Sequence, residues 1–186
     1  MSDGISTLAP ALEALLFASS EPIPIAELAR VLDISTAEIN ELLTVLDQEY
    51  QQPNRGFMLD NAGGGIRLVS KPAYASIISE LLRPVRAAGL SQAAVETLAI
   101  VAYKQPITRA EIEAVRGVRA ESALNSLLER DLVMEVGRKD APGRPILYST
   151  TNRFLVEFGI NSLAELPPLE EVGQASLDFS NKPDKT

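Results

Sequence analysis

The side chains that most enzymes use as nucleophile, general base or metal ligand are missing from this sequence. The chain has no cysteine and no histidine, which removes thiolate and imidazole ligands, disulfides, and the usual Ser–His and Cys–His pairs. It also lacks a glycine loop followed by Lys and Ser or Thr, the pattern that binds nucleotide phosphates. We therefore expect no catalytic residues, no metal and no cofactor, and we expect a protein that is not an enzyme.

The remaining candidates for chemistry are acidic pairs and one glycine cluster. Glu170 and Glu171 lie in a polar segment beside prolines, where a solvated charge pair is the simpler interpretation. Glu27 and Glu111 fall near predicted helix starts, where the helix dipole favours a carboxylate. Gly63–Gly65 could hold a phosphate, but neither a helix start nor a Lys follows it. We expect a flexible turn at the tip of a hairpin instead.

Charge bears on whether the protein binds nucleic acid. The net charge of −8 repels a phosphate backbone, so DNA binding would need a local basic patch. Residues 35–52 contain no Lys or Arg. Residues 89–160 carry nine basic and nine acidic side chains, and three of the basic ones, Arg138, Lys139 and Arg144, cluster on the predicted hairpin. This cluster contacts either a phosphate or an acidic partner, or it is simply a solvated hairpin, and the sequence leaves these alternatives open.

Helical and alternating patterns predict the elements that position these residues. In the first half, apolar residues at helical spacing predict three helices, then a β-hairpin and a fourth helix. The capping box Ser35–Glu38 marks the start of the third helix. The predicted elements are helices near residues 8–16, 25–32 and 35–52, strands at 56–60 and 65–69, and a helix at 72–82.

The second half repeats the same plan. Residues 106–112 align with residues 22–28, and Thr108–Glu111 is a second capping box. Helices near 91–104, 108–116 and 120–131 precede strands at 133–136 and 146–149, and a last helix follows. The predicted fold is therefore mainly α with small β-hairpins, an α+β chain of two tandem winged helix-turn-helix domains. We predict domains at 1–84 and 85–168, a linker at 84–89, and a disordered tail at 169–186.

Several motifs carry a resemblance to a known family. They are the segment Leu90–Ile112 with Arg116–Val118, then Gly137–Arg138, Pro142–Pro145, Tyr148, Thr150–Thr151, Phe154–Leu155, Phe158–Gly159 and Leu163–Pro167. Leu15–Ala18 and Glu21–Pro22 add to it in the first half. Over about residues 8–168 the chain resembles the segregation and condensation protein B family.

The resemblance implies a function that composition alone does not indicate. Members of this family form homodimers, largely through their N-terminal domains. Their C-terminal domains bind the middle of the kleisin subunit, segregation and condensation protein A. With the SMC ATPase they build a ring complex that condenses and partitions the chromosome before cell division. The resemblance therefore implies a cytoplasmic, nucleoid-associated protein that touches DNA at most indirectly and no membrane.

We predict a kleisin-binding surface in the second half from the positions of its helices and of its predicted hairpin, the wing of the winged-helix fold. Its residues are Tyr103, Gln105, Arg109, Arg116, Arg144 and Tyr148. Tyr103 has a second interpretation, in which it covers the core of its own domain, and this is the more favoured one. For the homodimer, the first and fourth helices carry an apolar surplus, which the sequence does not separate from core residues. The alternative function is a DNA-binding transcription regulator that uses Arg138 and Arg144.

Overall fold

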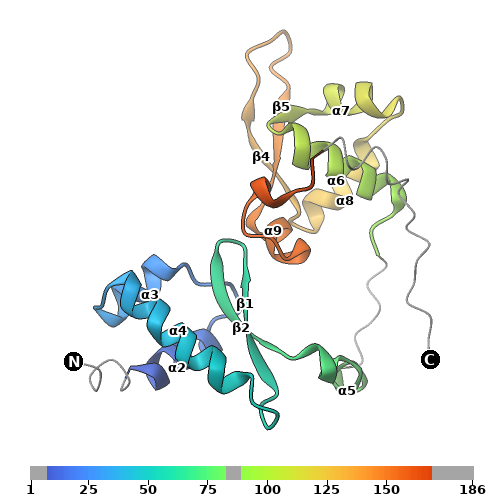
Figure 1. Ribbon diagram of the computed structural model, residues 1–186. Coiled ribbons are helices and arrows are strands. Elements are labelled where there is room, and N and C mark those ends of the chain that lie inside the picture. The colour runs from blue at the N-terminus through green and yellow to red at the C-terminus, as the bar shows by residue number, and fades with distance from the viewer. Residues whose placement is uncertain (1–7, 83–88, 169–186) are drawn as a thin grey trace.

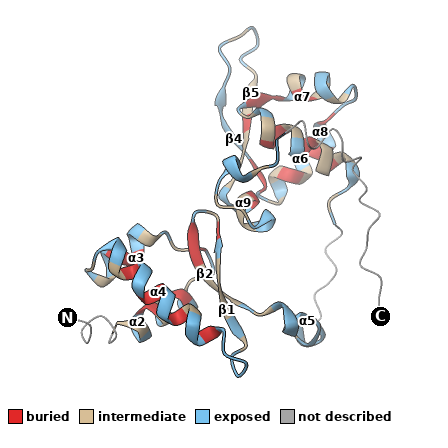
Figure 2. Cartoon of the chain, in the orientation of Figure 1, coloured by how far each residue is buried: buried red, intermediate tan, exposed pale blue. Residues whose placement is uncertain are grey.

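The computed structural model describes residues 8–82 and 89–168. Buried side chains form two hydrophobic clusters, one drawn from residues 12–66 and one from residues 94–154. Figures 1 and 2 show these clusters as two groups of elements, each with its own buried interior. We call residues 8–82 the first module and residues 89–168 the second module. The predicted linker lies almost wholly outside the described residues, and the predicted tail lies outside them entirely.

The first module has three helices, a hairpin and a final helical segment. In order, these are α2 (Ala9–Ala18), α3 (Ile25–Leu32), α4 (Thr36–Tyr50), β1 (Phe57–Ala62), β2 (Gly65–Ser70), the 3-10 turn η1 (Pro72–Tyr74) and α5 (Ala75–Leu82). The predicted capping box begins α4, because the Ser35 hydroxyl accepts a bond from the Glu38 N–H and the Glu38 carboxylate accepts one from the Ser35 N–H. The Tyr50 hydroxyl donates to Glu13 at 2.5 Å and joins α4 to α2.

The β1–β2 hairpin turns through two glycines. Ala62 pairs with Gly65, and Gly63 and Gly64 between them have φ values of +64° and +73°. Positive φ at both central positions is the requirement of a type I′ turn. Gly65 serves a different purpose, because a Cβ there would lie 2.8 Å from the Ile23 carbonyl carbon. Because Gly65 has no side chain, Ile23 can form an antiparallel bridge with Ile66 beside the β1–β2 hairpin.

The second module follows the same order. Its elements are α6 (Gln92–Lys104), β3 (Ile107–Thr108), α7 (Arg109–Arg116), α8 (Glu121–Glu129), β4 (Val133–Arg138), β5 (Ile146–Thr150), α9 (Asn152–Phe158) and the 3-10 turn η2 (Leu163–Glu165). The strands form an antiparallel sheet in the order β3-β5-β4, with a bulge between Glu135 and Gly137. The predicted fold class, mainly α with small antiparallel sheets in two winged helix-turn-helix modules, is confirmed.

The helix predicted at 72–82 forms as the 3-10 turn η1 followed by α5, and its apolar side is not packed. None of the residues of α5 is buried, and Leu81 is 81% exposed. Figure 1 shows η1 and α5 standing away from the helices of the first module. The apolar side of this helix therefore lacks a cover within the described residues. No helix of the described residues is long and apolar enough to cross a membrane.

Candidate functional site

The second capping box anchors the predicted partner surface at the start of α7. The Thr108 hydroxyl accepts from the Glu111 N–H at 3.3 Å, and the Glu111 carboxylate accepts from the Thr108 N–H at 2.9 Å. Lys139, on the β4–β5 hairpin, forms an ion pair with the same carboxylate. The Lys139 ammonium and the Thr108 donors lower the pKa of Glu111 to about 2. Glu111 therefore serves its helix start, as expected, and also holds the wing against α7.

Gln105 is committed to bonds inside the module. Its side-chain oxygen accepts from the Thr150 N–H at 2.6 Å, and its amide nitrogen donates to the Thr150 hydroxyl at 3.0 Å and to the Ala102 carbonyl at 3.2 Å. The half-buried side chain thus ties the end of α6 to the end of β5. Gln105 positions these elements and does not present its amide to a partner.

Arg116 and Tyr148 are not exposed for a direct contact. The Arg116 side chain is 6% exposed, and its guanidinium bonds to the Glu96 carboxylate and the Arg119 carbonyl, both at 3.1 Å. Tyr148 belongs to the hydrophobic cluster at 8% exposure, and burial raises the pKa of its hydroxyl. The prediction placed both at the surface because periodicity indicates which side of a helix or strand a residue lies on. It does not indicate how far neighbouring elements bury that residue.

Tyr103 is half-buried, and its hydroxyl donates to the Pro167 carbonyl at 2.6 Å. This bond fastens the segment after η2 against α6. The favoured interpretation, in which Tyr103 covers its own module, agrees with this position.

Arg109 and Arg144 are the two predicted residues that the structure leaves exposed. Arg109 lies at the start of α7 and pairs with Glu121 at 3.5 Å, with both side chains more than half exposed. Arg144 lies in the β4–β5 turn, where its carbonyl accepts from the Arg138 guanidinium at 3.0 Å. These two arginines, with Arg138, give the wing side of the second module its positive charge.

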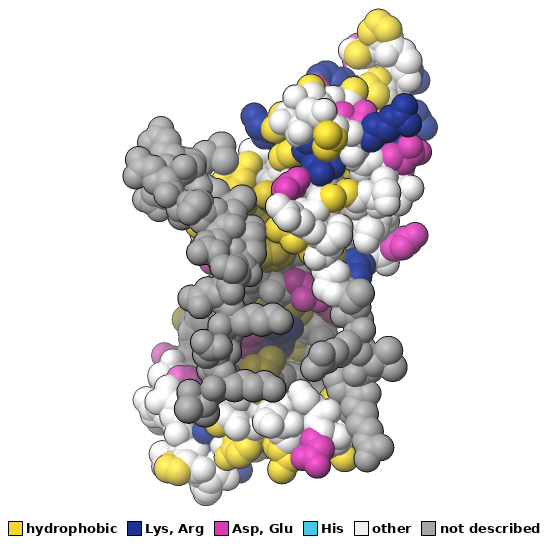
Figure 3. Space-filling view, turned by 90° about the vertical axis from the view of Figure 1, so that its right-hand side faces the viewer, with side chains coloured by type: hydrophobic (Ala, Val, Ile, Leu, Met, Phe, Trp, Pro, Cys, Tyr) yellow, Lys and Arg dark blue, Asp and Glu magenta, His cyan; other side chains and the backbone are white. Residues whose placement is uncertain are grey.

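Four exposed apolar residues of the second module were not predicted. Val115 and Val118 flank the Gly117 stop of α7, and Met134 and Val136 lie on β4, each between 45% and 58% exposed. Figure 3 shows Lys and Arg side chains lying beside hydrophobic ones over the second module. Arginine beside exposed apolar groups is the composition of a protein interface. The alternation of Met134 and Val136 along the strand could have indicated an exposed apolar face. The same alternation is equally typical of a strand face that packs against the core.

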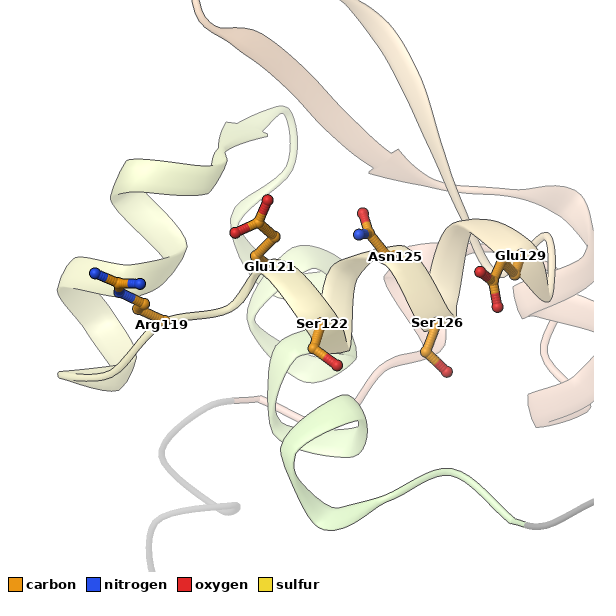
Figure 4. A pocket seen from close by; sticks show the side chains of 6 residues that line it. All are labelled: Arg119, Glu121, Ser122, Asn125, Ser126 and Glu129. Carbon is orange, nitrogen blue, oxygen red and sulfur yellow. The ribbon is translucent and has the colours of Figure 1, made fainter.

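The helices that would read DNA carry no basic side chain. In the helix-turn-helix plan α4 and α8 occupy the reading position, and neither sequence contains Lys or Arg. A shallow hollow runs along α8 (Figure 4), lined by Arg119, Glu121, Ser122, Asn125, Ser126 and Glu129. Ser122 and Ser126 extend from one side of the helix, and Glu121 and Asn125 extend from the other. The lining of this hollow has two carboxylates and one guanidinium, so it does not favour a phosphate backbone.

The first module has its own exposed apolar set. The side chains are Phe17 on α2, exposed by 75%, and Ile77, Leu81 and Leu82 on α5, exposed by 65%, 81% and 68%. These are the two helices in which the sequence shows an apolar surplus that could serve either the homodimer or the core. Large apolar groups left uncovered in this way mark a contact surface.

The described residues include no group of three or more acidic side chains arranged to hold a metal ion. The Arg67 and Asp60 ion pair, at 2.7 Å, lies across the first hairpin and is structural.

Comparison with known proteins covers both modules. The family model of the segregation and condensation complex subunit ScpB matches residues 10–169. Segregation and condensation protein B of Carboxydothermus hydrogenoformans is 48% identical over 171 residues, 92% of each chain. That of Symbiobacterium thermophilum is 50% identical over 159 residues, 86% of this chain and 72% of that one.

Solved structures give a weaker likeness. The crystal structure of ScpB from Mycobacterium tuberculosis has a TM-score of 0.41 at 33% identity and covers 84% of this chain and 98% of that one. On the family model and the identity to these relatives, the chain belongs to the family of segregation and condensation complex subunit ScpB.

Proposed function

We propose that this protein is a non-enzymatic subunit of the SMC–kleisin condensin-like complex and acts in chromosome condensation and partition. It binds the kleisin, segregation and condensation protein A, as a homodimer in the cytoplasm, at the nucleoid. The observation that carries the proposal is the family match across both modules, from residue 10 to residue 169. The sequence has no Cys and no His, and α4 and α8 contain no Lys or Arg. Both features agree with a scaffold role.

The two domains divide the work in this proposal. Residues 1–84 form the dimerisation domain, supported by the exposed apolar side chains of α2 and α5. Residues 85–168 form the kleisin-binding domain, supported by the arginines and apolar residues on the α7 and β4 side. Within it, Arg109 and Arg144 contact the partner directly. Gln105, Arg116 and Tyr148 shape the surface from inside, and Tyr103 flanks it.

The experiment measures how much of the central kleisin segment the purified full-length protein retains. Arg109→Glu combined with Arg144→Glu is expected to weaken kleisin binding by about tenfold or more, because reversing two exposed contact charges replaces attraction with repulsion. Arg153→Glu is the matched control, since Arg153 is an exposed arginine of the same module that pairs only within α9. If the wild-type protein retains no kleisin segment, the proposed function is wrong. If the double variant binds as tightly as Arg153→Glu, the surface is wrong.

A further inference from the structure

The tip of the first hairpin does not end in solvent. The Gly63 N–H donates to the Ile160 carbonyl of the second module at 3.0 Å. Figure 1 shows the β1–β2 turn reaching the end of α9. Ala62, beside the turn, is fully buried although it belongs to neither hydrophobic cluster. The glycine cluster thus lies at a hairpin tip, as expected, and this tip contacts the second module.

The second module presents a fixed acceptor to this turn. Gly159, with φ +65°, ends α9 in the left-handed conformation, and the Ile160 N–H bonds back to the Leu155 carbonyl at 3.0 Å. This is the Schellman arrangement, which closes the last turn of the helix and sets the direction of the chain after it. The Ile160 carbonyl is therefore held in place by α9 and points at the hairpin.

Gly63 fits this position because it has no side chain. A Cβ at Gly63 would lie 2.7 Å from the Val156 Cγ2 and 3.2 Å from the amide of Asn152, both on α9. The Asn152 side chain can rotate, but Val156 is β-branched and has little rotamer freedom in a helix. A Cβ at Gly64 would meet only the Asn161 carbonyl, at 3.8 Å, which is an ordinary contact. The close approach is thus specific to one of the two turn glycines.

From these observations we infer that the Gly63 turn and the Asn152–Val156–Ile160 side of α9 form an interdomain latch that fixes the orientation of the two modules. The latch is separate from the exposed arginines of the second module and from the apolar side of α5. It sets the angle at which one chain presents these two surfaces. A fixed angle between the modules favours binding by a partner that contacts both, because the two surfaces need not be ordered when the complex forms.

The test measures the distance between the modules in the full-length chain by pulsed spin-label spectroscopy. Gln48→Cys on α4 and Ser122→Cys on α8 place labels at exposed positions, and the chain has no other cysteine. Labelled protein is diluted into unlabelled protein so that distances within one chain dominate. The measurement uses the protein alone and does not depend on kleisin binding. We expect one narrow distance distribution with the native turn.

Two alanine variants separate the latch from the strain of the turn. Gly63→Ala is expected to abolish the narrow distribution, because its Cβ collides with Val156. Gly64→Ala is the matched control, since its φ of +73° is also positive but its Cβ makes only an ordinary contact, and the narrow distribution is expected to remain. Gly63→Ala combined with Val156→Ala removes the colliding methyl and is expected to restore it.

The latch is refuted if the distribution with the native turn is already broad, or if Gly63→Ala leaves it unchanged. It is also refuted if Gly64→Ala broadens it as much as Gly63→Ala. If Gly63→Ala fails to fold, as judged by circular dichroism, Val156→Arg tests the same contact from α9 without touching the turn. Loss of the narrow distribution in that variant supports the latch, and an unchanged distribution overturns it.

Discussion

Polar side chains join the helices of the second module to its sheet. Gln105 bridges α6 and β5, Glu111 bridges α7 and the β4–β5 hairpin, and the Thr151 hydroxyl donates to the Asp131 carbonyl at 2.5 Å. Each of these bonds connects residues 20 or more positions apart in the chain. Losing one therefore changes how whole elements sit against each other.

Gln105→Ala is expected to destabilise the second module by about 1–3 kcal/mol, because it leaves the half-buried Thr150 N–H without its side-chain acceptor. Urea unfolding followed by circular dichroism measures the change. Asn125→Ala, on the exposed face of α8, is the control and is expected to stay within about 0.5 kcal/mol of the native protein. Equal midpoints for the two variants would show that the Gln105 bridge contributes nothing.

Glu111 makes the stability of the second module depend on pH. Its pKa is lowered from 4.5 to about 2 in the folded protein, so it stabilises the fold fully above about pH 4.5. That contribution is lost as the pH falls from 4.5 towards 2. Glu111→Gln is therefore expected to lower the melting temperature most at neutral pH.

The difference in melting temperature between native and Glu111→Gln protein should shrink over that same acid range. Thermal melts at a series of pH values measure it, with Glu129→Gln on α8 as the control. A difference that does not change with pH would contradict the assigned role of the carboxylate.

The helix α5 distinguishes the first module from an ordinary winged helix. Its apolar residues recur at helical spacing like those of α4, yet α4 buries Ile39, Leu42, Leu43, Leu46 and Tyr50 while α5 buries none. A side chain such as Leu81, exposed by 81%, gains most of its burial energy only on association. The proposed homodimer supplies that cover.

Leu81→Asp is expected to raise the dissociation constant of the homodimer by about tenfold or more, since it places a charge at the centre of the proposed apolar contact. Sedimentation velocity over a range of protein concentrations measures this. Val118→Asp changes an exposed apolar residue of the second module and should leave dimerisation intact. An unaltered dimer in Leu81→Asp would exclude α5 from the interface.

Periodicity predicted the helices well because their buried residues recur every three or four positions in the chain. The apolar residues of α4 and α6 and both capping boxes lie where the sequence placed them. The strand β3 was missed because Ile107–Thr108 is too short to show alternation, and its pairing with Leu147 and Tyr148 is remote in sequence. The same limit applies to the site: the buried Arg116 side chain pairs with Glu96, whose proximity no local pattern indicates.

Across the whole molecule, charge separates the two candidate functions. The net charge is −8, and neither α4 nor α8 carries Lys or Arg. Of the basic wing cluster, Lys139 is neutralised by its ion pair with Glu111, whereas the Arg138 guanidinium bonds to the neutral Arg144 carbonyl and keeps its charge. A DNA-binding regulator needs several unpaired cations aligned along one groove. These features favour a surface for proteins over one for DNA.

The glycine cluster Gly63–Gly65 gives the molecule a means of holding its modules together. The absence of a side chain at Gly65 allows Ile23 to approach within the first module. The absence of one at Gly63 allows α9 of the second module to approach. Sequence alone could not separate these roles, because each depends on what lies opposite the glycine.

The mass of the protein in solution, measured by light scattering alone and with the central kleisin segment, tests the proposal most directly. We expect a particle of twice the 20.0 kDa of one chain, and a further increase by at least one kleisin segment on mixing. A mass of one chain that does not change when the segment is added would contradict a homodimeric, kleisin-binding subunit.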